Sequence, residues 1–394
     1  MSPCAAPVVG RPAARAAPVG VERRQVFDLP PTTVSVTEYQ LITRACWCGA
    51  RTTGVAPAGV IAPVSYGPQV ATAVVYHDQG QFLSKDRTAR AMSDLLGVSV
   101  SAGTVAAVTA RTATALSVPG GFTDTVRTQL RAGPGRTGPL IHFDETGLRV
   151  AGRLHWLHSA GTKGLTLLRA HRRHGIKAID AFVVLPGYTE IAVHDAWAED
   201  TYQGARRVLC GAHLLRELTA VVDHHALTGT QQGSTGPAGD WCWARQALDA
   251  LLAIKTLTDT ANTNGSTPDP AALSRHHRRL TNTATVGADP TRHPDPGTLG
   301  NKHRALARRI RDRETNYLAF TTDPAIPFDN NLAERDIRMV KIRQKISGSL
   351  RTLTGAQHFA AIRSYTATAG KNKINIYQAL IQLTEGNAWL PQPT

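Results

Sequence analysis

The stretch from 140 to 223 constrains the fold of this chain most, because strand-like and helix-like segments follow one another there in a definite order. Five segments have the apolar, β-branched character of strands: 140–150, 153–160, 164–171, 190–195 and 207–209. Ala151 and Gly152 predict a hairpin turn between the first two strands. Two further segments are predicted as helices: 175–182 and 212–222. Together they predict a mixed α/β sheet.

Two aspartates lie on the predicted strands. Asp144 lies in the apolar run of the first strand, and Asp195 ends the fourth. Three antiparallel strands, a helix and two more strands is the order of a ribonuclease-H-like sheet, in which the first strand is central and the fourth is its neighbour. We therefore expect Asp144 and Asp195 to lie on adjacent strands, where two carboxylates can share a metal ion.

A third acidic residue, Glu334, lies at the start of a strongly basic helix. If that helix begins near Asn331, four residues share one face: Glu334, Arg338, Lys341 and Lys345. The neighbouring apolar stripe, able to pack on the sheet, consists of Ala333, Ile337 and Val340. One helix would thus present a carboxylate and a row of phosphate-binding cations. The DNA-binding candidates on it are Arg335, Arg338, Lys341, Arg343 and Lys345.

Asp144, Asp195 and Glu334 form the pattern of a nuclease core that holds two divalent cations. Ions of the Mg²⁺ kind take carboxylate oxygens and keep several waters, so they need few protein ligands. Two such ions about 3.5–4 Å apart can activate the attacking oxygen and stabilise the leaving one in phosphodiester chemistry. We predict these three residues as both the metal ligands and the catalytic residues, and Mg²⁺ or Mn²⁺ as the cofactor.

Each of these acidic residues also has a structural explanation. An aspartate at the end of a buried strand is often a turn former or a helix cap. Asn331 and Glu334 fit a capping box, with the asparagine as cap and the glutamate three positions later. Taken singly, these explanations are the stronger ones. In this order and beside the basic helix, the three carboxylates favour a metal site.

The charge of the chain fits a DNA partner. The 394 residues carry a formal net charge of +15. Residues 301–380 hold 15 Lys and Arg against 6 Asp and Glu, so the excess is clustered. Clustered positive charge is typical of phosphate binding through counterion release. An Arg-rich coding bias is the alternative explanation for the overall charge.

The cysteines and the N-terminal residues indicate in which cellular compartment the protein is expected. Five irregularly spaced cysteines predict no disulfide framework; they are Cys4, Cys46, Cys48, Cys210 and Cys242. The first 20 residues lack the apolar region of a secretion signal. No run of 18 apolar residues suggests a transmembrane helix. We expect a soluble, cytoplasmic protein in contact with the nucleoid.

The remaining sequence divides into segments of distinct character. The expected organisation is a flexible N-terminal segment at 1–35, a small β module at 36–67, a helical region at 68–132, a first core part at 139–223, a helical and loop insertion at 224–320, and final core helices with a basic segment at 321–394. Within the insertion, 229–239 and 256–270 are predicted as loops, and helices are predicted at 240–257, 271–280 and 302–320.

Two of these segments have a specific candidate role. The β module contains Cys46 and Cys48, but one residue between them and no second cysteine pair make a degenerate zinc ribbon, so we expect no structural zinc. In the helical region, a helix ending at Leu96, Gly97, and a second helix capped by Ser101 or Thr104 outline a helix-turn-helix. An ordinary α-hairpin is the alternative, because the second helix offers few base-reading side chains beyond Thr109 and Arg111.

Several motifs together make the chain resemble the transposases of the insertion-sequence IS66 family. The matching stretches, over roughly residues 22–388, begin at Val26, Ala62, His142, Leu154, His194, Cys210, Asn330, Lys345 and Ile362. The resemblance implies a DDE triad of Asp144, Asp195 and Glu334 and metal-dependent cutting and joining of transposon ends. It also implies DNA partners, namely terminal inverted repeats and target DNA, with self-association on DNA and accessory proteins of the same element.

The chain also departs from the family pattern. The family usually has a longer N-terminal region with a zinc-binding stretch, and the Cys46–Cys48 pair has one residue fewer than the usual knuckle. The alternative function is therefore a catalytically inactive, truncated transposase remnant that only binds DNA. A ribonuclease or Holliday-junction nuclease on the same fold is a third possibility, which the insertion and the basic C-terminal segment disfavour.

Three residues near the predicted site leave their roles open. Cys210 and His213 have metal-like spacing but no partner pair in the sequence. A buried thiol with a hydrogen-bonded histidine is one explanation, and a supporting active-site role for His213 is the other. His194 should point to the opposite face of its strand from Asp195 and contribute to packing.

Overall fold

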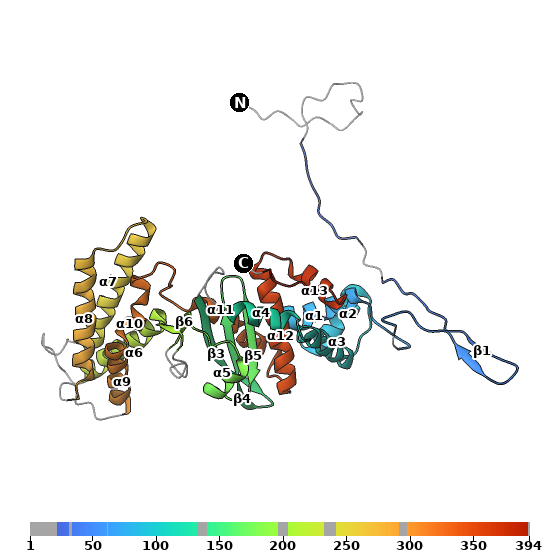
Figure 1. Ribbon diagram of the computed structural model, residues 1–394, viewed down its shortest axis with the longest axis horizontal. Coiled ribbons are helices and arrows are strands. Elements are labelled where there is room, and N and C mark those ends of the chain that lie inside the picture. The colour runs from blue at the N-terminus through green and yellow to red at the C-terminus, as the bar shows by residue number, and fades with distance from the viewer. Residues whose placement is uncertain are drawn as a thin grey trace, which may run out of the picture.

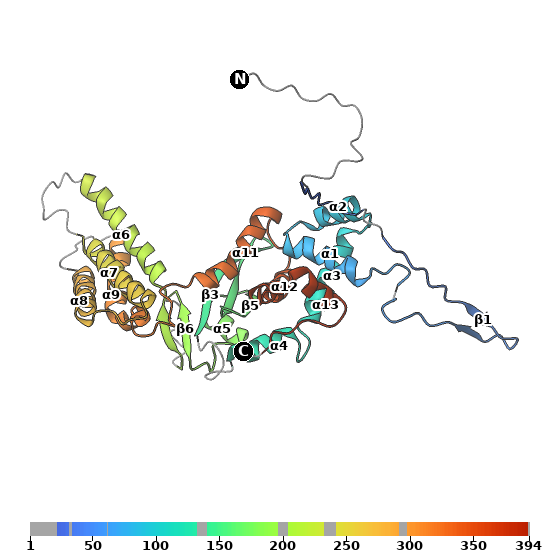
Figure 2. The ribbon, with the colours of Figure 1, turned by 90° about the horizontal axis from the view of Figure 1, so that it is seen from above.

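The computed structural model describes residues 22–30, 34–60, 62–131, 140–195, 204–231, 242–290 and 298–392. A mixed sheet occupies the middle of an elongated molecule, with a helical lobe on one side and a second group of helices on the other (Figures 1 and 2). Residues 1–21, the segment 132–139 between the helical region and the sheet, and most of the predicted loop at 229–239 lie outside the described residues.

The central sheet has five strands in the order β5-β4-β3-β6-β7. Their bounds are β3 Leu140–Val150, β4 Arg153–Gly161, β5 Thr166–His171, β6 Ile191–His194 and β7 Arg206–Leu209. All five lie within two residues of the predicted segments. β3 pairs antiparallel with β4, and β6 runs parallel to β3 on its other side. The first strand is therefore central and the fourth is its neighbour.

The hairpin between β3 and β4 turns at the predicted residues. Val150 pairs with Arg153, which leaves Ala151 and Gly152 as a two-residue loop. Both have positive φ, at 48° and 76°, as a turn that matches the twist of the strands requires. Glycine takes such a φ without steric cost, whereas Ala151 is strained there. The hairpin prediction is confirmed.

The two faces of β3 pack against different parts of the chain. Ile141 and Phe143 belong to a core that also contains residues of helix α5, Ile176–Phe182. Leu148 and Val150 belong to another core, together with Ile337 and Val340. The latter pair lies on helix α11, Asn331–Ser347, which contacts both β3 and β4. Because strand side chains alternate, residues 142, 144 and 146 share the α11 face with residue 148.

The helical region before the sheet contains four α-helices with a π-helical turn: α1 Pro68–Val75, η1 Tyr76–Gly80, α2 Lys85–Leu96, α3 Ala102–Ala115 and α4 Phe122–Arg131. Ser101 caps α3 by accepting a hydrogen bond from the Thr104 amide at 3.0 Å, as predicted. Thr109 is buried and donates its hydroxyl proton to Asp78 at 2.8 Å. Its candidacy as a base-reading residue was wrong, because that hydroxyl is held inside the helical core.

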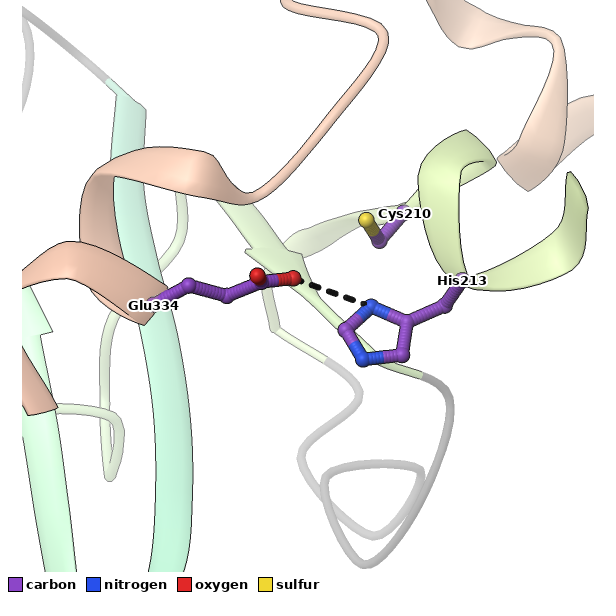
Figure 3. Close-up of side chains that lie close together, drawn as sticks. All are labelled: Cys210, His213 and Glu334. Carbon is purple, nitrogen blue, oxygen red and sulfur yellow. Dashed lines mark ion pairs between the residues drawn. The ribbon is translucent and has the colours of Figure 1, made fainter. Parts of the chain in front are cut away.

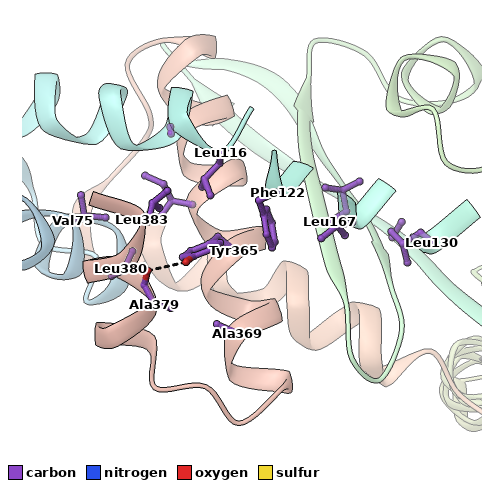
Figure 4. Packing of buried hydrophobic residues seen from close by; sticks show 14 of the residues in the cluster. Val75, Leu116, Phe122, Leu130, Leu167, Tyr365, Ala369, Ala379, Leu380 and Leu383 are labelled. Carbon is purple, nitrogen blue, oxygen red and sulfur yellow. Dashed lines mark hydrogen bonds between the residues drawn. The ribbon is translucent and has the colours of Figure 1, made fainter. Parts of the chain in front are cut away.

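The C-terminal helices complete this helical region. Helices α12, Leu353–Lys371, and α13, Ile376–Thr384, share one hydrophobic core with α1, α3 and α4 (Figure 4). The Tyr365 hydroxyl lies inside that core and donates to the Ala379 carbonyl at 2.8 Å. Segments about 300 residues apart therefore form one packed unit beside the sheet.

The insertion between Asp195 and Glu334 folds into a lobe of helices: α6 Gly211–Gln231, α7 Trp243–Thr263, α8 Pro270–Ala288, α9 Thr298–Asp312, α10 Glu314–Tyr317 and the short turn η3 Ala319–Thr321. The predicted loop at 256–270 was partly wrong, because α7 continues to Thr263. Thr258 and Ala261 are buried there, and this packing outweighs the weak helix propensity of the threonines.

The predicted single helix at 302–320 was also wrong, because the chain breaks at Arg313 between α9 and α10. After the break, Asn316 donates its side-chain amide to the Arg207 carbonyl at 2.9 Å, which ties α10 to β7. The Tyr317 hydroxyl accepts a hydrogen bond from Arg309 at 2.9 Å. These contacts with the sheet and with α9 require the change of direction.

The β module consists of one exposed antiparallel hairpin, formed by β1 Thr43–Ala45 and β2 Arg51–Thr53. Its turn carries Cys46 and Cys48, which are both free and exposed. Among the described residues, no helix is long and apolar enough to cross a membrane.

Candidate active site

The two aspartates lie at the same level of two neighbouring parallel strands, Asp144 within β3 and Asp195 directly after β6. His142 pairs with Val193, and Asp144 and Asp195 each lie two residues further along. With side chains alternating along each strand, both carboxylates belong to the same face of the sheet. His194, one residue earlier, belongs to the opposite face and is completely buried.

The sheet also separates Asp144 from its acidic neighbour Glu145. Asp144 is 8% exposed and lies on the face that α11 covers, whereas Glu145 points to the other face. There Glu145 forms an ion pair with its cross-strand partner His158 at 3.1 Å, and both side chains are buried. Glu145 is thus engaged away from the aspartate pair, and Asp144 is the carboxylate that faces the helix.

The side chain of Asn330 links the start of α11 to strand β3 through two hydrogen bonds. Its side-chain amide donates to the Phe143 carbonyl at 2.7 Å, and its side-chain oxygen bonds the His142 ring at 2.8 Å. Because the amide nitrogen is the donor to Phe143, the oxygen accepts, and His142 Nδ1 must carry the proton. Burial lowers the pKa of His142, in keeping with a neutral ring. Asn330 is completely buried.

Glu334 lies one turn into α11 and contacts a residue of the insertion. Its carboxylate Oε1 lies 3.4 Å from Nδ1 of His213, which belongs to the first turn of α6 (Figure 3). Both side chains are about one-third exposed. The capping-box explanation is wrong for this glutamate, because the Asn331 amide bonds Asp329 and no side chain of Asn330 or Asn331 caps the helix.

Cys210 completes this group of side chains. It follows β7 and is buried, and its sulfur accepts a hydrogen bond from the Asn330 amide at 3.2 Å. One ligand-type atom from each of Cys210, His213 and Glu334 lies within 4.8 Å of the others. Burial raises the pKa of the Cys210 thiol.

A glycine makes this approach of α6 and α11 possible. The Gly211 amide donates to the Phe328 carbonyl at 2.8 Å, in the segment that leads into α11. A Cβ at position 211 would lie 2.4 Å from the Phe328 ring, closer than real Cβ contacts. Any larger residue would therefore collide with the Phe328 ring and force it to move, beside the two segments that bring His213 to Glu334.

The five candidate DNA-binding cations of α11 fall into different settings. Arg335, Arg338, Lys341 and Lys345 are exposed. The Lys341 ammonium donates to the Gly147 carbonyl on β3 at 2.5 Å, so it lies over the same strand as Asp144. Arg343 packs instead on the Phe359 ring, with 5.7 Å between the guanidinium carbon and the ring centroid, and burial lowers its pKa.

Two features of the site were not found from the sequence. Asn330 was noticed only as part of a motif, since nothing in the pattern shows that its side chain is buried between strand and helix. The Cys210–His213 pair gave a usable signal through its spacing, but its partner is Glu334, 121 residues further along the chain. That partner becomes apparent only in the folded structure, where the insertion between the two residues forms a separate helical lobe.

A family model described as "Transposase IS66 family" matches residues 63–358, which is most of the chain. The chain belongs to the IS66 family of transposases. The match spans the sheet, the insertion and α11, and so includes all three predicted carboxylates. A search of curated proteins found no match. Membership in this family implies a role in transposition and confirms the resemblance inferred from the motifs.

Proposed function

We propose that this IS66-family chain is a DDE-type transposase that cleaves insertion-sequence ends and transfers the strands to target DNA, with Asp144, Asp195 and Glu334 as catalytic residues. The observation that carries the proposal is the meeting of three segments. β6 ends beside β3, so that Asp195, directly after β6, lies at the level of Asp144 within β3, and α11 covers the same face with Glu334 in its first turn. The strand order also supports a ribonuclease-H-like sheet.

The three carboxylates suit a hard divalent cation. Asp144 is nearly buried and Asp195 is half-buried, and each offers oxygen ligands of the kind that Mg²⁺ and Mn²⁺ prefer. Glu334 lies on a helix that Asn330 holds to β3, so its backbone position is fixed relative to Asp144. A pair of ions bound there would supply an activated nucleophilic oxygen and stabilise the leaving oxygen. We expect the carboxyl groups to lie within roughly 4–8 Å of one another when metal is bound.

The protein's own contribution is to bring phosphate to these carboxylates. Lys341 lies on the same strand-covering side of α11 as Glu334 and reaches β3 three residues beyond Asp144. Arg335 and Arg338 extend the exposed positive charge along the helix. Cations beside an acidic site offset the repulsion between the carboxylates and the DNA backbone. The partners we propose are the terminal inverted repeats and target DNA, with self-association on DNA and accessory proteins of the same element.

The test is the substitution Asp144→Asn, which keeps the size of the side chain and removes the charge that holds a hard cation. Cleavage of DNA carrying the element's ends, in Mg²⁺ or Mn²⁺, should fall by at least about 10³-fold, because a site that acts as a unit loses nearly all activity with any one member. Asp195→Asn and Glu334→Gln should behave alike. DNA binding in a gel-shift assay should be retained or become tighter.

The matched control is Asp94→Asn, which removes an exposed aspartate from α2. Cleavage should be unchanged in this variant. Persistent cleavage in Asp144→Asn would remove that residue from the mechanism. If the unmutated protein binds the element's ends but does not nick them, whichever divalent metal is added, the alternative function holds: a remnant that only binds DNA.

A further inference from the structure

We propose that Cys210, His213 and Glu334 form a binding site for a borderline-soft divalent metal of the zinc class, separate from the pair of aspartates. The three residues come from different elements: the turn after β7, the first turn of α6 and the first turn of α11 (Figure 3). Their sulfur, ring nitrogen and carboxylate oxygen all lie within 4.8 Å of one another.

The spacing between the nitrogen and the oxygen fits tetrahedral coordination. Zinc binds sulfur at about 2.3 Å and nitrogen or oxygen at about 2.0–2.2 Å, so neighbouring ligand atoms lie about 3.3–3.6 Å apart. The Nδ1 atom of His213 and the Oε1 atom of Glu334 are 3.4 Å apart. Two ligands are thus already at coordination distance from each other, and the contact between them is an ion-pair contact without a hydrogen bond.

The surroundings of Cys210 suit a metal-bound thiolate. The Asn330 amide donates to its sulfur at 3.2 Å, and the amides of Ala212 and His213 also lower the pKa of the thiol. Burial has the larger effect and raises that pKa, and the negative charge of Glu334 raises it further. A bound metal ion would supply positive charge beside the sulfur, and the amides would stabilise the sulfur as outer-shell donors.

The ligand types separate this site from the proposed catalytic one. Thiolate and imidazole select zinc-class ions, whereas carboxylate oxygens alone suit Mg²⁺ and Mn²⁺. Glu334 belongs to both sets. The consequence rests on the proposed function, in which Glu334 is also a ligand of the catalytic metal. A zinc-class ion would hold Glu334 towards α6 and so keep it away from Asp144 and Asp195. Zinc should then inhibit cleavage in Mg²⁺, and Cys210→Ser should relieve the inhibition.

The test uses Co²⁺ as a spectroscopic probe on the full chain under reducing conditions, without DNA. The parent protein carries serine in place of Cys4, Cys46 and Cys48, so that cysteines other than Cys210 and Cys242 cannot bind the probe. We expect a sulfur-to-cobalt charge-transfer band that saturates at one equivalent and is displaced by Zn²⁺. Cys210→Ser should abolish the band, and His213→Ala should weaken cobalt binding at least tenfold.

Cys242→Ser is the matched control, because Cys242 is also buried and free but lies at the start of α7. This variant should keep the band. A folded parent protein, checked by circular dichroism, that shows no band would overturn the proposal, as would a band that persists in Cys210→Ser. Because the band is read without DNA, its presence in a protein that never cleaves would leave the metal site standing and count against the proposed function alone.

Discussion

At the scale of single residues, Asn330 shows how one buried amide can hold a site together. It bonds the Phe143 carbonyl and the His142 ring from one side chain, while its backbone amide bonds Cys210. Three segments that are distant in sequence therefore meet at one residue. Its neighbour Asn331 is exposed and its side-chain amide donates to Asp329, so the two adjacent asparagines have very different roles.

We expect Asn330→Ala to lower the free energy of unfolding by about 2–5 kcal/mol, because it leaves one buried donor and one buried acceptor without partners. Asn331→Ala should change it by no more than about 0.5 kcal/mol, as is usual for a surface position. Urea denaturation of both variants measures the difference. Equal effects at the two positions would show that Asn330 is not the fastening residue.

The candidate site could be selected from the sequence only in part. Asp144 and Asp195 were recognisable because each lies in an apolar run, and the predicted strand order made them neighbours. Side chains alternate along β3, so Asp144 and Glu145 face opposite sides of the sheet, and both sides are covered. The structure was needed to choose between them, because it shows that Glu145 pairs with His158. The contact between Glu334 and His213 depends on how the insertion leaves the sheet, which no local pattern encodes.

At the scale of elements, α11 shows that a basic helix is not uniformly basic on its surface. Its apolar stripe was predicted correctly, since Ala333, Ile337 and Val340 are all buried. Periodicity also predicted the exposed cations at 338, 341 and 345. It could not show that Arg343 packs on Phe359, because that ring belongs to α12 and its position depends on tertiary packing.

This difference within α11 leads to a prediction about salt dependence. Arg338→Gln and Lys345→Gln should each lower the slope of log affinity against log salt by about one unit, because each removes one phosphate contact. Arg343→Gln should leave the slope unchanged, since its guanidinium is engaged with the ring. Binding measured on any DNA sequence at several salt concentrations gives the slopes. A slope that changes only in Arg343→Gln would place the DNA on another face.

The element predictions failed where tertiary contacts outweighed local preference. Strands 140–150 and 153–160 were placed correctly because their alternation and turn residues agree. The single helix at 302–320 was wrong because Asn316 and Tyr317 turn the chain towards β7 and α9. The end of α7 was wrong for a related reason, since burial of Thr258 extends a helix through residues with weak helix propensity.

At the scale of the whole molecule, helices from the beginning and from the end of the chain pack together beside the sheet. The sheet shares its cores with three groups of helices: those before it, those of the insertion and those at the end of the chain. The hydroxyl groups of Thr72 on α1 and Thr384 on α13 lie 2.8 Å apart, although more than 300 residues separate them. The helices before the sheet therefore depend on the last helix of the chain for part of their core.

Leu380 tests this dependence, because it is 1% exposed and lies on α13 in the core shared with α1 and α3. Leu380→Ala should lower the free energy of unfolding by about 2–5 kcal/mol, the usual cost of such a cavity. Gln382→Ala, at an exposed position on the same helix, is the control and should have little effect. Hydrogen exchange should also become faster in α1 and α3, far away in sequence, while the amides of α7 and α8 keep their protection. Loss of protection confined to α13 would show that the early helices are stable without it.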